Sequence, residues 1–212
     1  MKVSITLIIL ALSYLPGICQ QPSVSDMKTS IEKASNSPLY VKDVLKKKFK
    51  IDTIVVTRTE HFQSLADSLA YKGVIKKVYG PFTESKKRFL VQILAKAPNT
   101  FYRISQIFLD TSVFSQKFAD SMSNSITARI SSGQETFERL AQAYSMGGES
   151  ATQGDLGWVA QGVLLPTIEH ELAKRKKGEV FKIWSRNGIH IIKKTQEPKQ
   201  DTGFALMMRI FL

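Results

Sequence analysis

Strand-like and helix-like patterns alternate between Arg103 and Lys194, and their order leaves few folds open. The run from Arg103 to Leu109 is typical of a strand. Apolar residues then recur at every fourth position, which predicts one long helix that a following glycine can end. This stripe consists of Phe114, Phe118, Met122, Ile126 and Ile130. We expect the stripe to pack on the sheet, with Phe118 buried.

Two further helices and a strand pair complete this part of the sequence. One helix begins at Phe137, and another begins at Pro166, where a first-turn proline is tolerated. Between them, residues 145–154 contain three glycines and are predicted to form a flexible loop. Val180 to Trp184 and Ile189 to Lys194 alternate like paired antiparallel strands. This order indicates an α+β domain with helices packed on an antiparallel sheet.

The first half of the sequence shows a less regular series of patterns. Residues 20–38 are rich in Ser, Pro and Gln and suggest a mobile linker, although a short helix from Asp26 to Ala34 also fits. We then predict a helix, a strand, a second helix and a strand pair that turns at Gly80-Pro81. These elements cover residues 39–48, 51–57, 61–71, 74–79 and 89–94. A break is expected at Ala97-Pro98-Asn99, before the more regular second part.

The first nineteen residues have the layout of a cleaved secretory signal peptide. Lys2 gives a positive start, Val3 to Leu15 is almost entirely apolar, and a break with the small residues Gly17 and Cys19 follows before Gln20. The apolar run is shorter than the ~20 residues of a membrane span. Lipidation of Cys19 is the remaining alternative, but Ile18 stands where a small residue is wanted. We therefore predict an exported, periplasmic protein of a bacterial envelope that begins at Gln20.

The composition of the mature chain limits its chemistry and its partners. Cleavage after Cys19 would leave no cysteine for a disulfide or a nucleophile. Without Lys2, 29 basic residues stand against 18 acidic ones, a net charge of +11 that favours acidic clients or anionic surfaces. The lysines lack aromatic interleaving and zinc-ligand spacing, so nucleic acid is not an expected partner. Peripheral membrane contact fits the charge but is not expected.

Four motifs in the second half stand in a familiar order and spacing. They are Gln134 to Ser145, Gln153 to Trp158, Gln161 to Pro166 and Asn187 to Lys193. In these motifs the chain resembles the parvulin family of peptidyl-prolyl isomerases, or rotamases, as in periplasmic SurA-type chaperones and related foldases. The resemblance covers residues 101–197. It implies a small α+β domain with a four-stranded antiparallel sheet and flanking helices, which uses neither a metal nor a cofactor.

The resemblance also implies site residues, several of which depart from the family pattern. His190 matches the second of two paired histidines, Gln106 stands in place of the first, and Ser145 matches a serine. These three are the candidate catalytic residues. The Asp or Cys usual nearby is replaced by Met146 or Gly147. The candidate substrate-binding residues are Leu164, Ile168, Met146 and Asn187.

Each of these residues also has a purely structural interpretation. His190 stands between two isoleucines of a predicted strand and could be a core histidine bonded by Ser145 or Gln106. Leu164 and Ile168 would be buried in any fold. The sequence leaves both interpretations open.

A sequence echo suggests a second, incomplete unit. Lys72 to Tyr79 matches Lys177 to Trp184 at a single offset. Phe101 to Leu109 and Phe204 to Leu212 share Phe, Ile, Phe and Leu at equivalent places. We therefore predict that residues 39–97 form a smaller α/β segment, a partial rotamase-like repeat that the C-terminal strand at residues 203–212 would complete. Chance similarity between short apolar strands is the alternative.

Two functions from different classes follow. The first is a parvulin-type isomerase and foldase with weak activity, which acts on unfolded or proline-containing exported polypeptides. The second is a catalytically degenerate rotamase domain that binds such clients as a periplasmic chaperone. A purely structural envelope subunit ranks last.

Overall fold

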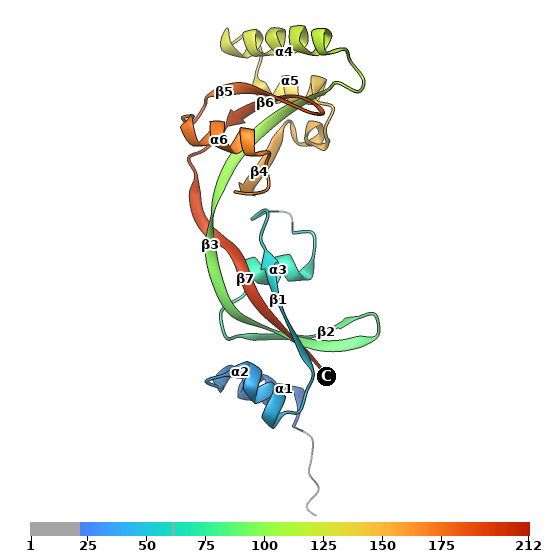
Figure 1. Ribbon diagram of the computed structural model, residues 1–212, viewed down its shortest axis with the longest axis vertical. Coiled ribbons are helices and arrows are strands. Elements are labelled where there is room, and N and C mark those ends of the chain that lie inside the picture. Colours follow the sequence, from blue (N-terminus) through green and yellow to red (C-terminus); the bar gives the residue numbers. More distant parts are fainter. Residues whose placement is uncertain (1–21, 61) are drawn as a thin grey trace, which may run out of the picture.

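The computed structural model describes residues 22–60 and 62–212. The predicted signal peptide at residues 1–19, with Cys19, lies outside the described residues. The molecule is elongated, and one antiparallel sheet runs along its length (Figure 1). Neighbouring strands follow the order β1-β7-β3-β6-β5, and both β2 and β4 also pair with β3.

The described elements have the following bounds. The strands are β1 (Phe49–Val55), β2 (Val78–Glu84), β3 (Lys87–Asp110), β4 (Asp155–Ala160), β5 (Val180–Ser185), β6 (Gly188–Lys194) and β7 (Lys199–Phe211). The helices are α1 (Val24–Lys33), α2 (Ser37–Leu39), α3 (Leu65–Lys72), α4 (Gln116–Ser131), α5 (Phe137–Tyr144) and α6 (Pro166–Lys174), with a π-helical turn η1 (Tyr40–Val44) and a 3₁₀ turn η2 (Gly148–Thr152).

Local sequence explains where the longer helices begin. Hydroxyl side chains just before α1, α3, α4 and α5 accept a hydrogen bond from a first-turn N–H that has no partner inside the helix. These capping residues are Ser23, Ser64, Ser115 and Thr136. α6 begins instead at Pro166, whose missing N–H costs nothing in the first turn.

Strand β3 is continuous where the sequence predicted a break. It passes through Ala97-Pro98-Asn99 and spans 24 residues. The pairing with β7 shifts register between Ala97 and Pro98. A proline cannot donate a ladder hydrogen bond, and an irregularity of this kind is where a sheet tolerates it. The predicted break was therefore wrong, and one strand serves both halves of the molecule.

In the second half, β3 lies between β4 and β6, and β5 pairs with the far side of β6. Helices α4 and α5 lie on one face, where they bury Ile107 and Leu109 of β3. On the other face, Ile168 and Leu172 of α6 pack on Ile104 and its neighbours. This arrangement confirms the predicted α+β fold with helices flanking an antiparallel sheet.

The prediction that Phe118 is buried was wrong. Its side chain is 50% exposed and stacks on Phe114, with ring centroids 5.0 Å apart. The buried positions of α4 are Ala119, Ser123 and Ile126. A four-residue interval advances about 40° beyond a full turn at each step, so the stripe winds away from the sheet at its ends.

The first half is more ordered than the predicted linker. Met27 and Ile31 of α1 are buried, so the segment at residues 24–33 folds onto the sheet. The helix predicted over residues 39–48 is reduced to α2 and η1. Lys46 follows with a φ of 52°, a left-handed conformation that ends the helical path.

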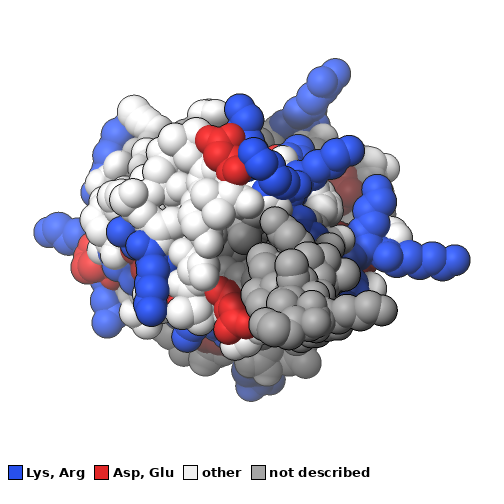
Figure 2. Space-filling model, turned by 90° about the horizontal axis from the view of Figure 1, so that it is seen from below, with Lys and Arg blue, Asp and Glu red and all other residues white. Residues whose placement is uncertain are grey.

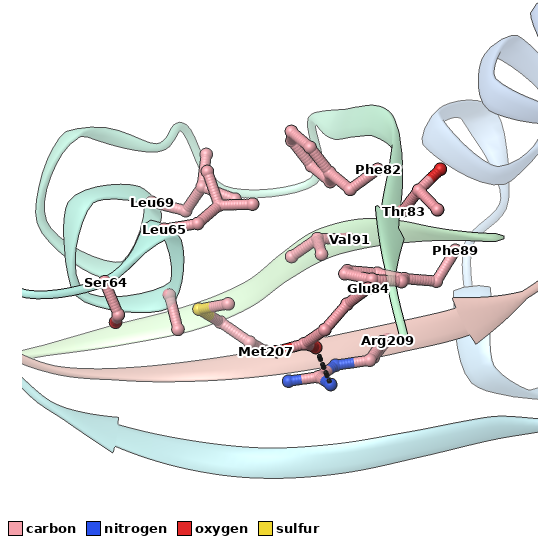
Figure 3. Close-up of a pocket in the computed structure, with 11 residues that line it drawn as sticks. Ser64, Leu65, Leu69, Phe82, Thr83, Glu84, Phe89, Val91, Met207 and Arg209 are labelled. Atoms are coloured by element: carbon pink, nitrogen blue, oxygen red, sulfur yellow. Dashed lines mark hydrogen bonds and ion pairs between the residues drawn. The ribbon is translucent and has the colours of Figure 1, made fainter. Parts of the chain in front are cut away.

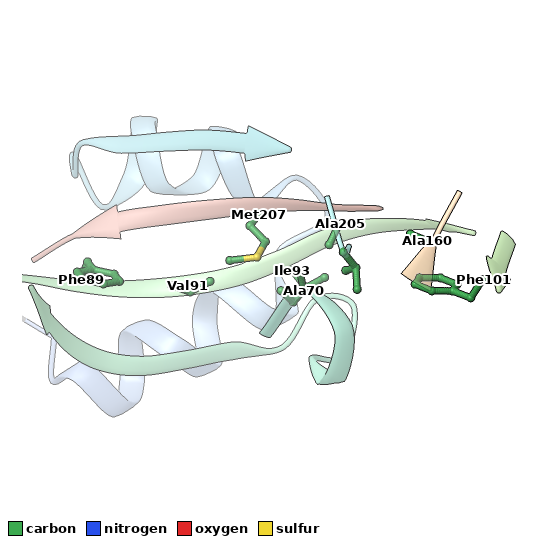
Figure 4. Close-up of a cluster of buried hydrophobic side chains, with 9 residues drawn as sticks. Ala70, Phe89, Val91, Ile93, Phe101, Ala160, Ala205 and Met207 are labelled. Carbon is green, nitrogen blue, oxygen red and sulfur yellow. The ribbon is translucent and has the colours of Figure 1, made fainter. Parts of the chain in front are cut away.

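The two halves share apolar packing (Figure 4). One buried cluster extends along β3 from Phe89 through Val91 to Phe101 and includes Ala160 of β4. The Ala160 N–H also donates to the carbonyl of Thr57, at 2.9 Å. None of the helices in the described ranges is both long enough and apolar enough to cross a bilayer.

Candidate active site

The sheet face that carries α6 remains apolar for only part of its length. Ile104 and Ile192 lie under the helix, within its buried cluster. Alternate residues of a strand share a face. The same face therefore carries Gln106, two residues after Ile104 on β3, and His190, two residues before Ile192 on β6. Phe108 lies directly opposite His190, with ring centroids 4.8 Å apart. The polar pair therefore lies where the core ends.

Both ring nitrogens of His190 are engaged. Nδ1 lies 3.1 Å from Oε1 of Gln106, and Nε2 lies 2.9 Å from Oγ of Ser185. Burial lowers the pKa of His190 below its ordinary value of 6.5, and the nearby charge of Glu149 partly opposes this shift. The imidazole is therefore neutral at pH 7.

Glu149 connects this pair to Ser145. Its Oε1 accepts hydrogen bonds from Nε2 of Gln106 at 3.1 Å and from Oγ of Ser145 at 2.8 Å. Ser145 in turn accepts from the N–H of Phe108, at 2.9 Å. The result is a continuous polar network from β5 through β6 and β3 to the loop after α5.

The sequence-derived candidates divide into two groups. The network brings together the three candidate catalytic residues, His190, Gln106 and Ser145. In the described part of the chain, the four candidate substrate-binding residues contribute no side-chain hydrogen bond to it. Two of them touch it through the backbone: the N–H of Asn187 donates to Ser185 at 3.2 Å, and the N–H of Met146 donates to the carbonyl of Phe108 at 2.8 Å. Their roles therefore depend on where each side chain lies.

The candidate substrate-binding residues differ in exposure. Ile168 is 2% exposed and supports the apolar floor from within the core, whereas Leu164 is half-buried at the edge of the same cluster. Met146 is exposed, and its sulfur accepts from the N–H of Asp110 at 3.4 Å. Asn187 lies exposed in the β5–β6 turn. Leu164 is thus the one of the four that is partly buried against the apolar cluster under α6.

Sequence reasoning missed Glu149, Ser185 and Phe108. Phe108 could have been found, since it lies two residues beyond Gln106 on the predicted strand and so shares its face. Glu149 and Ser185 carried no local signal. A glutamate in a glycine-rich loop and a serine before a turn usually face solvent.

A hollow lies in the first half of the molecule, with a volume of about 320 Å³. Leu65 and Leu69 of α3 and Phe82 of β2 stand on one side, above Val91 and Met207 (Figure 3). At one end Arg209 forms an ion pair with Glu84, at 3.2 Å, and its guanidinium lies 5.0 Å from the centroid of the Phe89 ring.

Comparison with family models identifies the second half of the molecule as a rotamase domain. Residues 93–196 match the family model for the rotamase, or PPIC-type PPIASE, domain. Through this domain the chain belongs to the parvulin-type peptidyl-prolyl isomerases.

Several known proteins are similar to this chain. The chaperone SurA of Chromohalobacter salexigens is 29% identical over 66% of this chain and 28% of its own length. The foldase PrsA of Geobacillus kaustophilus is 35% identical over 35% of this chain and 27% of its own. Among solved structures, the Nitrosopumilus maritimus parvulin is 30% identical over 46% of this chain and 96% of its own, with a TM-score of 0.37. The chain thus spans about a third or less of the length of the curated SurA and PrsA relatives.

Proposed function

We propose that the protein catalyses cis–trans isomerisation of Xaa-Pro bonds in exported polypeptides. The observation that carries this proposal is the His190–Gln106 pair beside an apolar floor in a PPIC-type domain. Isomerisation must overcome an amide barrier of about 18–20 kcal/mol, and no bond to hydrogen is broken. An apolar surface for the proline ring and a few fixed polar groups beside the twisting amide therefore suffice.

The same geometry supports weak activity. The hydrogen bonds of His190 to Gln106 and Ser185 occupy both ring nitrogens. Its ring can therefore shape the site and set its polarity, but it has no free N–H for the substrate unless one of these bonds opens. The site chemistry requires no metal or cofactor.

An isomerase assay on short Xaa-Pro peptides tests this proposal. We expect His190→Ala to lower the rate by about tenfold or less, which corresponds to about 1.4 kcal/mol. Leu164→Glu should abolish catalysis, because it places a charge at the edge of the apolar floor. His170→Ala, an exposed change on α6, is the matched control. A wild-type rate equal to the uncatalysed rate would refute the proposal.

The second candidate function is binding of unfolded clients, and the hollow beside α3 favours it. Around that hollow the strand order is β1-β7-β3-β2, and around the rotamase site it is β4-β3-β6-β5. In the first half, α3 lies in the sequence between the two edge strands β1 and β2. In the second half, α6 lies in the same way between the edge strands β4 and β5. We propose that residues 39–97 and 203–212 form one split module, in which β7 takes the place that β3 has in the rotamase domain.

The pairing register supports this correspondence. Phe89 pairs with Phe211 as His190 pairs with Phe108. Two positions back from Phe211 is Arg209, as Gln106 is two positions back from Phe108. The split module would therefore present an apolar groove in which a phenylalanine replaces the histidine, a surface suited to binding rather than to isomerisation.

Suppression of client aggregation tests this second function. Leu65→Glu changes an exposed leucine at the hollow, and Val113→Glu changes an exposed valine of the rotamase half as a control. We expect the first variant to lose suppression and keep isomerase activity. Equal suppression by both variants would exclude the hollow as a client site.

Charge and the N-terminal sequence support the proposed location and clients. Lysine and arginine side chains project around the end of the molecule that Figure 2 shows, where acidic groups are fewer. Together with the excess of basic residues, this favours acidic polypeptides as clients. We propose export to the periplasm on the basis of residues 1–19. Mass spectrometry of the secreted chain would test for a start at Gln20 and would reveal a lipid on Cys19.

A further inference from the structure

The carboxylate of Glu149 is buried and belongs to the polar network of the site. It is 8% exposed, and its Oε1 receives hydrogen bonds from two site residues. Within the described residues no ion pair is formed by this carboxylate. Burying a charged group costs free energy unless its hydrogen bonds are well satisfied. Packing alone therefore does not explain why a glutamate is buried at this position.

The backbone around Glu149 is adapted to this side chain. A Cβ added at Gly147 would overlap the carboxylate of Glu149. Gly147 has φ −90° and ψ 171°, an extended conformation open to any residue. The backbone of Gly147 would accept another residue, but any side chain there would displace the Glu149 carboxylate from its place in the network. Put differently, a short side chain at position 147 would point to the place that the Glu149 carboxylate now occupies.

An ionised carboxylate only accepts hydrogen bonds, and this fixes the direction of the whole network. Gln106 must present its NH₂ group to Glu149, so its Oε1 faces His190. Nδ1 of His190 must then carry the proton and donate to that oxygen. Nε2 is left as an acceptor, and the single hydroxyl proton of Ser185 must then point to Nε2, at 2.9 Å, instead of to the carbonyl of Gly188, at 3.2 Å. One negative charge thus selects one amide orientation and one imidazole tautomer.

We propose that Glu149 is a positioning residue of the rotamase site, which acts through Gln106 to hold His190 as its Nδ1–H tautomer. The expected effect of Glu149 on the reaction rate rests on the proposed isomerase function. Its effect on the His190 tautomer does not depend on that function. The proposed role also assigns a requirement to position 147: an aspartate there can replace Glu149 if position 149 is truncated.

The test uses three variants of the full chain. Glu149→Gln can donate as well as accept, so it no longer selects one orientation of Gln106. Glu149→Ala removes the acceptor. The double variant Gly147→Asp with Glu149→Ala returns a carboxylate to the same space from a different position. Glu138→Gln, which removes a carboxylate that pairs with Lys193 outside the network, is the control.

Nitrogen-15 NMR of the His190 ring is the primary measurement, since it reports the tautomer without any assay of activity. We expect the Nδ1–H tautomer in the wild type, in the control and in the double variant, and a mixture in the two single variants. The isomerase rate should fall in Glu149→Ala by no more than the roughly tenfold expected for His190→Ala, because Glu149 acts through that histidine, and it should recover at least partly in the double variant.

Two outcomes would overturn the proposal. One is an unchanged tautomer in Glu149→Ala, and the other is a tautomer that the double variant does not restore while its thermal unfolding matches that of the wild type. If the wild type has no isomerase activity, the proposed function fails, and the NMR comparison still decides the role of Glu149.

Discussion

Replacing Ile210 by alanine tests whether the C-terminal strand is part of the core of the first half. Ile210 of β7 is 1% exposed and packs in a cluster with Ile31, Val41 and Leu90. The substitution removes three carbon groups, worth about 0.8 kcal/mol each, or about 2.4 kcal/mol of transfer free energy. A cavity cost adds to this, so we expect a loss of about 3–4 kcal/mol in the free energy of unfolding.

Urea unfolding followed by two probes measures this loss. Far-UV circular dichroism reports the whole molecule. Tryptophan fluorescence reports Trp184 of β5, in the second half, and Trp158 of β4, which packs on the cluster that the two halves share. Because β3 runs through both halves, we expect both probes to shift together. Leu206→Ala, on the same strand but 37% exposed, should cost less than about 1 kcal/mol.

Two results would refute this reasoning. A loss below about 1 kcal/mol for Ile210→Ala would mean that β7 does not close the core as described. A shift seen by circular dichroism but not by fluorescence would mean that the two halves unfold independently, despite their shared strand.

Three further predictions concern the rotamase half. Phe118→Ala should cost less than about 1.5 kcal/mol by chemical unfolding, whereas Phe137→Ala, at a side chain that is 1% exposed, should cost about 3–5 kcal/mol. Ile168→Glu should unfold the domain, while Leu164→Glu should keep the wild-type circular dichroism spectrum and lose activity. The pKa of His190 in the folded protein lies below 6.5, so the unfolded chain takes up the proton first as the pH falls. The free energy of unfolding should therefore decrease as the pH drops below about 6.5, and measurements over the same pH range on His190→Gln should lack this decrease.

Much of the rotamase fold could be predicted from the sequence because its signals are local. The helix at Phe137 and the strands on either side of Asn187 follow from residue spacing, and their order limits how they pack. The face of α4 could not be read in the same way. Its regular four-residue stripe includes Phe118, which the structure leaves half exposed, because the stripe drifts around the helix over several turns.

The features that local patterns did not reveal all depend on contacts between distant segments. Pro98 signals a break in an isolated segment, but β7 arrives from a hundred residues away and pairs across it with a shifted register. The site shows the same limit. The sequence places Met146 or Gly147 where the family has an Asp or Cys, and the loop brings the carboxylate of Glu149 to the space beside Gly147. Comparing the chain with the family pattern one position at a time therefore indicates that the Asp or Cys is missing, although the structure places the Glu149 carboxylate in the network.

Strand register connects the stability of the rotamase half to its site. Gln106 and His190 share their sheet face with Ile104 and Ile192, while Ile107 and its neighbours face α4 and α5. A slip of one residue in the pairing of β3 with β6 would move polar side chains into one core and isoleucines out of the other. Burial of the isoleucines on both faces therefore holds the polar pair in place. Since Ile168 and Leu172 of α6 pack on Ile104 and Ile192 of this face, the buried core ends where Gln106 and His190 begin.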